Sequence, residues 1–310
     1  MTDLPYILLI GPIEEPVLAR MCAKLAGRNV TLVLIDFQQP RKELPIALSV
    51  GDDHSLAVLQ VGTRTIPLTA IRSTYIRFFR SLAPPSSEAT DSGEKTWHHH
   101  SVYLNLINML PGLVVNPLEA ATTNASKPYQ GMLISKSGFK VPDTLVTSIP
   151  DDAKNFFEMC QKRVIYKSIS SVRSVVHRLN PEDFSRLDHI RHCPVQFQKY
   201  IPGIDIRVHV VGKRVFASQI ETSATDYRYS EAESFRAIRG IELPVDLQEK
   251  CVTLTEGLGL SLAGIDLRRT LEGEYYCFEV NTSPAFNFYE DQTGQRIGDA
   301  LADLLCRGTT

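Results

Sequence analysis

The segment YYCFEVNTSP places Glu279 and Asn281 two residues apart in an aromatic, strand-like run. Residues i and i+2 of a strand point to one face, so this pair presents three side-chain oxygen atoms to the same point. The run LAGIDLRRT carries Asp266, and a short turn around Gly273 predicts that the two runs form a hairpin. Such oxygen ligands suit Mg²⁺, which also binds water and substrate phosphates. We therefore predict a magnesium site; its alternative is an edge-strand carboxylate followed by a turn-forming asparagine.

Two lysines on separate predicted elements are candidate ligands for phosphate. Lys127 lies in NASKPYQ, and Lys167 ends the otherwise apolar strand-like run RVIYK. An ammonium group there needs an anionic partner to offset its desolvation, and a nucleotide phosphate supplies one. For either lysine alone, the alternative is a solvated tip on an apolar stem.

An extended segment, VQFQKYIPGIDIRVHVVG, joins the middle of the chain to its last third. The backbone N–H and C=O groups of such a connector can pair with the edge of an adenine ring. Asp205 can accept hydrogen bonds from ribose hydroxyl groups, and Arg207 can hold phosphate oxygens. The alternative is an interdomain strand with a surface ion pair.

The order and spacing of these motifs resemble the ATP-grasp superfamily. The most similar group is the RimK-like one, which contains ribosomal-protein glutamate ligases and microviridin-type peptide macrocyclases. The resemblance covers residues 116–305 and rests on Lys127, Lys167, QKYIPGIDIRV, GIDLRR and FEVNTSP. The first third of the chain is similar to the pre-ATP-grasp domain of that family, more weakly.

The resemblance implies ATP and Mg²⁺ as cofactors and assigns a role to each motif. Arg207 is implied to hold phosphate or the reacting carboxylate. The implied nucleotide-binding residues are Lys127 and Lys167 for the phosphates, the backbone of Lys199, Tyr200 and Ile201 for adenine, and Asp205 for ribose. The implied Mg²⁺ ligands are Asp266, Glu279 and Asn281.

Two departures from the family pattern lie beside these motifs. A glycine-rich loop usually follows the second lysine, yet KSISSVRSVVHRL contains no glycine. We expect its serines and Arg173 to replace some of the amide contacts to phosphate. The family ending N-x-S-P-G is altered to Ala285.

The segment TDYRYSE resembles the Asp-Trp-Arg segment of the peptide macrocyclases, with Tyr227 in place of tryptophan. Asp226 and Arg228 are therefore candidate substrate contacts, and Arg228 is predicted to be catalytic together with Arg207. A charged surface loop is the alternative.

Two other features invite a functional interpretation. Arg77 is flanked by bulky apolar residues, so it either faces the cleft or forms a salt bridge, and we expect the salt bridge. The internal WHHHS segment contains three successive histidines. They would point in different directions on a helix, which disfavours a metal site there.

Composition restricts the class of protein. A chain of 310 residues with 43% hydrophobic residues predicts two or three packed units. A net charge of −2 disfavours binding to nucleic acid or to a membrane surface. Six scattered cysteines without a Cys-x-x-Cys pair favour a reduced, cytoplasmic protein without disulfides or a zinc cluster. The apolar run YILLI is too short for a signal sequence or a membrane span.

Three units are expected to position these residues in an α/β (α+β) ATP-grasp fold. Residues 1–115 are expected to form the pre-ATP-grasp α/β domain, and residues 116–201 and 202–310 two antiparallel-sheet subdomains that hold the nucleotide between them. The C-terminal subdomain carries the metal site. Expected helices are 14–29, 101–117, 121–138, 150–161, 246–260 and 293–307. Expected strands are 6–10, 31–37, short pieces in 56–79, 141–148, 163–170, 171–179, 195–201, two in 204–221, 262–270 and 274–281.

These features predict an ATP- and Mg²⁺-dependent carboxylate–amine ligase. ATP would phosphorylate a substrate carboxylate, and an amine would attack the acyl phosphate to give an amide. The alternatives are a small-molecule kinase of the same fold and a nucleotide-binding regulatory module, which the altered loop favours and the complete metal triad disfavours. The expected partners are a carboxylate and an amine, without nucleic acid or membrane; a precursor peptide and a homodimer stay open.

Overall fold

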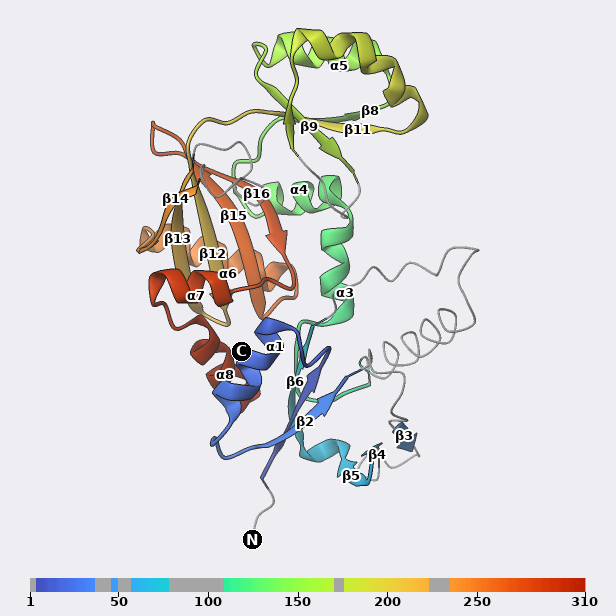
Figure 1. Cartoon of the computed structure of the whole chain (residues 1–310), viewed down its shortest axis with the longest axis vertical. Helices are drawn as coiled ribbons and strands as arrows, with labels where there is room; N and C mark the ends of the chain where they lie inside the picture. Colours follow the sequence, from blue (N-terminus) through green and yellow to red (C-terminus); the bar gives the residue numbers. More distant parts are fainter. Residues whose placement is uncertain are drawn as a thin grey trace.

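The computed structural model describes residues 4–36, 46–49, 57–77, 107, 109–169, 176–222 and 235–309. The described residues form four β-sheets (Figure 1). The sheet that contains β8, β9 and β11 lies at one end, and the first strands of the chain lie at the other. The predicted Arg173, Asp226 and Arg228, and the WHHHS segment, lie outside the described residues.

The first unit contains a parallel sheet in the order β2-β1-β6-β7. Its elements are β1 (Tyr6–Ile10), α1 (Pro16–Leu25), β2 (Thr31–Ile35), β6 (Ile71–Ile76) and β7 (Leu113–Val115). A small antiparallel sheet contains β3 (Ile46–Ser49), β4 (Val58–Val61) and β5 (Arg64–Pro67), and a 3-10 turn, η2 (Leu68–Ala70), follows it. The predicted order of strand, helix and strand over residues 6–37 is confirmed by β1, α1 and β2. The helix predicted over 101–117 is wrong at its end, because LVV forms β7 after Gly112, whose φ of 74° ends the preceding turn.

The middle part carries a four-stranded antiparallel sheet in the order β10-β9-β11-β8. Its elements are α3 (Leu118–Ala121), η3 (Thr122–Ala125), α4 (Lys127–Lys136), β8 (Thr144–Thr147), α5 (Pro150–Met159), β9 (Val164–Ser168), β10 (His177–Arg178), η4 (Pro181–His192) and β11 (Val195–Lys199).

Two predictions for this part need correction. The single helix over 121–138 is interrupted at Ser126, which is extended (φ −124°, ψ 94°). Pro128 explains the break. A proline has no N–H to donate and its ring clashes with the preceding turn, so a helix cannot continue through it without interruption. The strand predicted over 171–179 is reduced to the two residues of β10 in the part that the structure describes, and the helix η4 that follows was not predicted.

The last part contains a five-stranded antiparallel sheet in the order β14-β13-β12-β15-β16. Its elements are β12 (Ile204–Val211), β13 (Arg214–Thr222), β14 (Phe235–Ile241), α6 (Val245–Gly257), β15 (Leu262–Arg269), β16 (Tyr275–Asn281), α7 (Asn287–Thr293) and α8 (Ile297–Arg307). The two predicted hairpins are present, with Gly212 (φ 56°) and Gly273 (φ 84°) at their turns. Strand β14 and helix α7 were not predicted.

The hydrophobic clusters do not coincide with the sheets, because one cluster contains residues from both ends of the sequence. One cluster joins β1 and α1 of the first unit to α8, through residues such as Leu9, Leu18 and Leu301. A second lies between the five-stranded sheet and α6. The middle sheet packs its own cluster around Phe157 and Phe197. Strand β11 leads from this separate core into residues 200–203, the connector before β12. The connector therefore joins two bodies that each pack a core of their own, the middle sheet and the five-stranded sheet.

Within the described ranges, no helix is both long and apolar enough to cross a membrane. All six cysteines are free.

Candidate active site

The predicted metal ligands come together on the β15–β16 hairpin, away from its turn. Asp266 lies directly opposite Glu279, as the sequence predicted. The amide nitrogen of Asn281 lies 3.3 Å from Asp266 Oδ2. The register shifts after Asp266, where Phe278 is the extra residue of β16, and such a bulge changes the direction of the side chains next to it. Two carboxylates and one amide therefore gather on one sheet.

This donor set consists of hard oxygen ligands, which fit Mg²⁺ better than a transition metal. Among the residues that the structure describes, no group of three or more histidine, cysteine, aspartate or glutamate side chains could hold a metal ion. The triad is not such a group, because its third member is an asparagine.

Two cations balance the two carboxylates. Arg207 lies opposite Asp266 on the neighbouring strand, and its Nη1 donates to Asp266 Oδ1 at 2.7 Å. Lys127, at the first turn of α4, places Nζ 3.9 Å from Glu279 Oε2. All four side chains are less than one-fifth exposed. Gly264 makes room for the guanidinium, since a Cβ there would lie 2.4 Å from Arg207 Nη2.

The second predicted lysine lies on the middle sheet. Lys167, in β9, is 8% exposed and pairs with Gln196 of β11. Directly opposite residues on antiparallel strands point to the same face. Lys167 therefore lies on the face of the middle sheet that carries Gln196.

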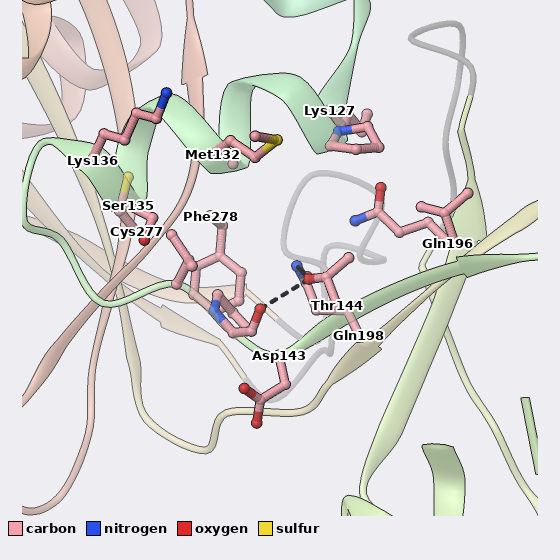
Figure 2. A pocket seen from close by; sticks show the side chains of 15 residues that line it. Lys127, Met132, Ser135, Lys136, Asp143, Thr144, Gln196, Gln198, Cys277 and Phe278 are labelled. Carbon is pink, nitrogen blue, oxygen red and sulfur yellow. Dashed lines mark hydrogen bonds between the residues drawn. The ribbon is translucent and has the colours of Figure 1, made fainter. Parts of the chain in front are cut away.

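A cavity of about 570 Å³ lies against this face. Figure 2 shows it between α4, which contributes Lys127 and Met132, and the sheet, from which Gln196 extends toward α4. Phe278, the bulge residue of β16, lines a third side. Cys277 also lines the cavity, but burial raises the pKa of its thiol well above the usual value, so the thiol stays protonated.

Two buried glutamines give this cavity unused hydrogen-bond acceptors. Gln196 and Gln198 are 3% and 5% exposed, and within the described part of the chain their Oε1 atoms have no hydrogen-bond partner. Buried acceptors require a donor, so they fit a ligand with N–H groups, such as the amino group of adenine. These residues were not predicted, although two glutamines at i and i+2 in the strand VQFQK are a signal for a polar face.

The predicted adenine contacts, Lys199, Tyr200 and Ile201, are each bound to a different part of the chain. Lys199 ends β11 and forms an ion pair with Asp143 at 3.3 Å, and the N–H of Tyr200 donates to Arg163 O. The carbonyl of Ile201 accepts from Arg268 Nη1 at 3.0 Å.

Asp205, the predicted ribose contact, is bound to the same arginine. Arg268 Nε and Nη2 both lie 2.7 Å from Asp205 Oδ1. The sequence pattern did not single out Arg268.

Arg77 forms a salt bridge, as predicted, with Glu15 at 2.9 Å. Its side chain is fully buried and also donates to the carbonyls of Ser283 and Pro284 at 2.8 and 3.0 Å. The first unit therefore holds the loop that directly follows the β16 ligands.

His209 lies on the same face of β12 as Arg207 and contacts the same loop at Ala285. Its Nε2 lies 3.3 Å from Ala285 O, and its ring packs against Tyr289. Burial, and then the charge of Arg207, lower the pKa of His209 well below its usual value, so the ring is neutral.

Solved structures of similar architecture define the class of this fold. The ATP-grasp ligase PsnB, complexed with a phosphomimetic variant of its minimal precursor, Mg and ADP, superimposes with a TM-score of 0.81 at 23% identity, covering 98% of each chain. A RiPP-associated ATP-grasp ligase from Chryseobacterium gregarium, in complex with ADP and a leader and core peptide, gives a TM-score of 0.82 at 22% identity, covering 99% of this chain and 98% of that one. The fold is therefore an ATP-grasp fold, as predicted.

The chain belongs to the family of the RimK-like ATP-grasp domain, whose model matches residues 125–305. A probable alpha-L-glutamate ligase from Aliivibrio fischeri (strain MJ11) is 24% identical over 222 residues, which are 69% of this chain and 73% of the relative. The predicted family and the predicted class of enzyme, an ATP-dependent carboxylate–amine ligase, are thereby confirmed.

Proposed function

We propose that this ligase activates a carboxyl group of a peptide as an acyl phosphate and joins it to an amine. One observation carries the proposal. Arg207, Asp266 and Glu279 lie together on one sheet, and Lys127 of α4 lies beside them. A peptide substrate is supported by the neighbours of the same fold, PsnB and the Chryseobacterium gregarium ligase, whose structures include precursor peptides.

The proposed nucleotide site follows the face of the middle sheet. Gln196 and Gln198 accept hydrogen bonds from the adenine amino group, and Lys127 and Lys167 neutralise the phosphates. Asp266, Glu279 and Asn281 hold Mg²⁺, which when bound neutralises charge on the phosphate oxygens during transfer. Because Arg207 and Lys127 already lie beside the two carboxylates, the positive charge is oriented before the substrate arrives.

The proposed reaction has two steps. An oxygen of the substrate carboxylate attacks the γ-phosphorus of ATP, the bond to ADP breaks, and Arg207 stabilises the negative charge on the carboxylate and the transferred group. The amine nitrogen then attacks the carbonyl carbon of the acyl phosphate, phosphate leaves with the bonding electrons, and the nitrogen loses a proton. The protein contributes mainly the positions of the reacting groups.

Interception of the acyl phosphate tests this proposal. With ATP, Mg²⁺ and a glutamate- or aspartate-containing peptide as the acid, hydroxylamine should give a hydroxamate together with ADP and phosphate. We expect Asp266→Asn to suppress the product, and Glu274→Gln, which changes an exposed carboxylate in the turn of the same hairpin, to leave it unchanged. A stable phosphorylated alcohol without hydroxamate would establish a kinase, and AMP with pyrophosphate would exclude the acyl phosphate.

The other expectations stay proposals. They are unit boundaries at residues 115 and 201, a cytoplasmic location, a homodimer and a substrate contact by Arg228. Light scattering measures the mass in solution, and a monomer would exclude the homodimer. Arg228→Met should raise the KM for the peptide and leave that for ATP unchanged, and unchanged peptide kinetics would remove Arg228 from the site.

A further inference from the structure

Arg268 connects the predicted ribose contact, Asp205, and a predicted adenine contact, Ile201, with Phe278 in the wall of the cavity. It binds the carboxylate of Asp205 through two nitrogen atoms, each 2.7 Å from Oδ1. Its third nitrogen donates to the carbonyl of Ile201, in the connector between the middle and last sheets, at 3.0 Å. Its guanidinium also lies over the ring of Phe278, 5.3 Å from the centroid, and Phe278 lines the cavity.

These contacts are built into the fold rather than made by a mobile surface side chain. Arg268 and Asp205 are directly opposite on β15 and β12, and both side chains are only 13% exposed. A Cβ at Gly203 would lie 2.9 Å from Arg268 Cγ, so the glycine leaves room for the arginine stem beside the connector. A charge-assisted pair with little access to water restricts the orientation of the carboxylate.

A second arginine extends the arrangement to the middle sheet. Arg178 of β10 lies over the ring of Tyr200 at 4.4 Å, and Arg268 lies 5.8 Å from the same centroid. Tyr200 belongs to the connector, directly before Ile201. The connector that joins the two packed bodies is therefore contacted by one arginine from each.

We propose that Arg268 is a positioning residue that orients Asp205 toward the ribose and thereby selects ribonucleotides over 2′-deoxyribonucleotides. The inference rests on the proposed nucleotide site. Arg268 fixes the carboxylate that accepts from the ribose hydroxyl groups, and it fixes the Ile201 peptide next to the adenine. Without the arginine, the carboxylate loses its preferred orientation, so a 2′-hydroxyl group contributes less to binding.

Calorimetry tests this inference without an acceptor substrate. The dissociation constants of Mg-ATP and Mg-2′-deoxy-ATP are measured for the wild type and for Arg268→Met, Arg268→Lys and Asp205→Asn. We expect the wild type to prefer ATP by about tenfold or more, which is the loss typical of one hydrogen bond to a charged group. In Arg268→Met the preference should fall to about twofold or less, as in Asp205→Asn, and Arg268→Lys should recover part of it because the cation is kept.

Two further variants make the result specific. Arg269→Met makes the same chemical change one residue along β15, where the side chain points to the other face, and should keep the wild-type preference. The variant Arg268→Met/Asp205→Asn removes both charges, so it leaves no buried carboxylate unpaired if the single variant fails to fold. Its preference should equal that of Asp205→Asn alone, because Arg268 acts through Asp205.

The outcomes separate this inference from the proposed function. A full preference for ATP in folded Arg268→Met, or a further loss in the double variant, would overturn the role of Arg268 and leave the ligase proposal intact. A wild type that binds both nucleotides equally would remove the ribose assignment. Nucleotide binding without any hydroxamate would instead overturn the acyl-phosphate proposal and leave the role of Arg268 standing.

Discussion

Replacement of Arg77 by methionine tests how strongly the first unit is tied to the loop after β16. The arginine side chain is fully buried, and its partner Glu15 has a side chain that is 9% exposed. Methionine fills a similar volume but leaves the Glu15 carboxylate buried without its cation. Breaking a buried pair in this way costs about 3–5 kcal/mol of folding free energy. This is a large part of the roughly 5–15 kcal/mol that stabilises a typical domain.

A second substitution separates the charge from the packing. Glu15 also caps α1, because an oxygen of its side chain accepts from the N–H of Leu18 at 2.7 Å. Glutamine keeps an acceptor oxygen and removes the charge, so Arg77→Met/Glu15→Gln should be more stable than Arg77→Met alone. The hydrogen bonds to Ser283 and Pro284 stay lost, so stability should recover only in part.

Urea unfolding followed by circular dichroism measures these differences. Arg72→Met provides the control, because Arg72 lies in β6, the strand that Arg77 directly follows, and makes an exposed hydrogen bond to Cys306 O. We expect the control to change the midpoint little. A loss of less than about 1 kcal/mol in Arg77→Met, or no recovery on adding Glu15→Gln, would refute the buried ion pair between Arg77 and Glu15 as a stabilising contact of the first unit.

Four further results are expected. Glu279→Gln should abolish Mg²⁺-dependent ATP turnover without a change in circular dichroism, and wild-type turnover would remove the metal assignment. Lys167→Met should weaken ATP binding in calorimetry much more than adenosine binding, because only the phosphates lose a partner; equal losses would indicate a structural lysine. Asn116→Ala removes a buried amide that pairs with four backbone groups and should cost about 2–6 kcal/mol in urea unfolding; a loss below about 1 kcal/mol would contradict this. Burial raises the pKa of Cys251 to about 12, so a thiol reagent at pH 9 should label exposed Cys193 and spare Cys251 until the protein unfolds, as peptide mass spectrometry can establish.

The parts of the site that the sequence predicted are those that local geometry determines. Asp266 and Glu279 face each other because a short turn joins two alternating strands, and a turn of that length restricts the register. Glu279 and Asn281 share a face because a strand has a period of two. These relations extend over fewer than twenty residues, so they can be inferred without knowledge of the rest of the fold.

The parts that could not be predicted depend on pairings between distant segments. Arg77 contacts Ser283 across 206 residues of chain, and Arg268 contacts Asp205 across 63. No local pattern specifies such partners, because they follow from which strands become neighbours in a sheet. The break at Ser126 has a local cause instead, because Pro128 prevents a continuous helix through this point, and a sequence pattern can therefore predict it.

The cluster that α8 shares with the first unit has a consequence for synthesis on the ribosome. Leu9, Leu18 and Met21 emerge from the ribosome long before their partners Leu301 and Leu304. Domains usually fold in the order of their synthesis, but here the first unit cannot bury the apolar face of α1 until α8 has been made. The middle sheet, with its own core, can pack earlier. We therefore expect nascent chains to expose the apolar face of α1 until α8 emerges from the ribosome, and chaperones to bind the first unit rather than the middle one.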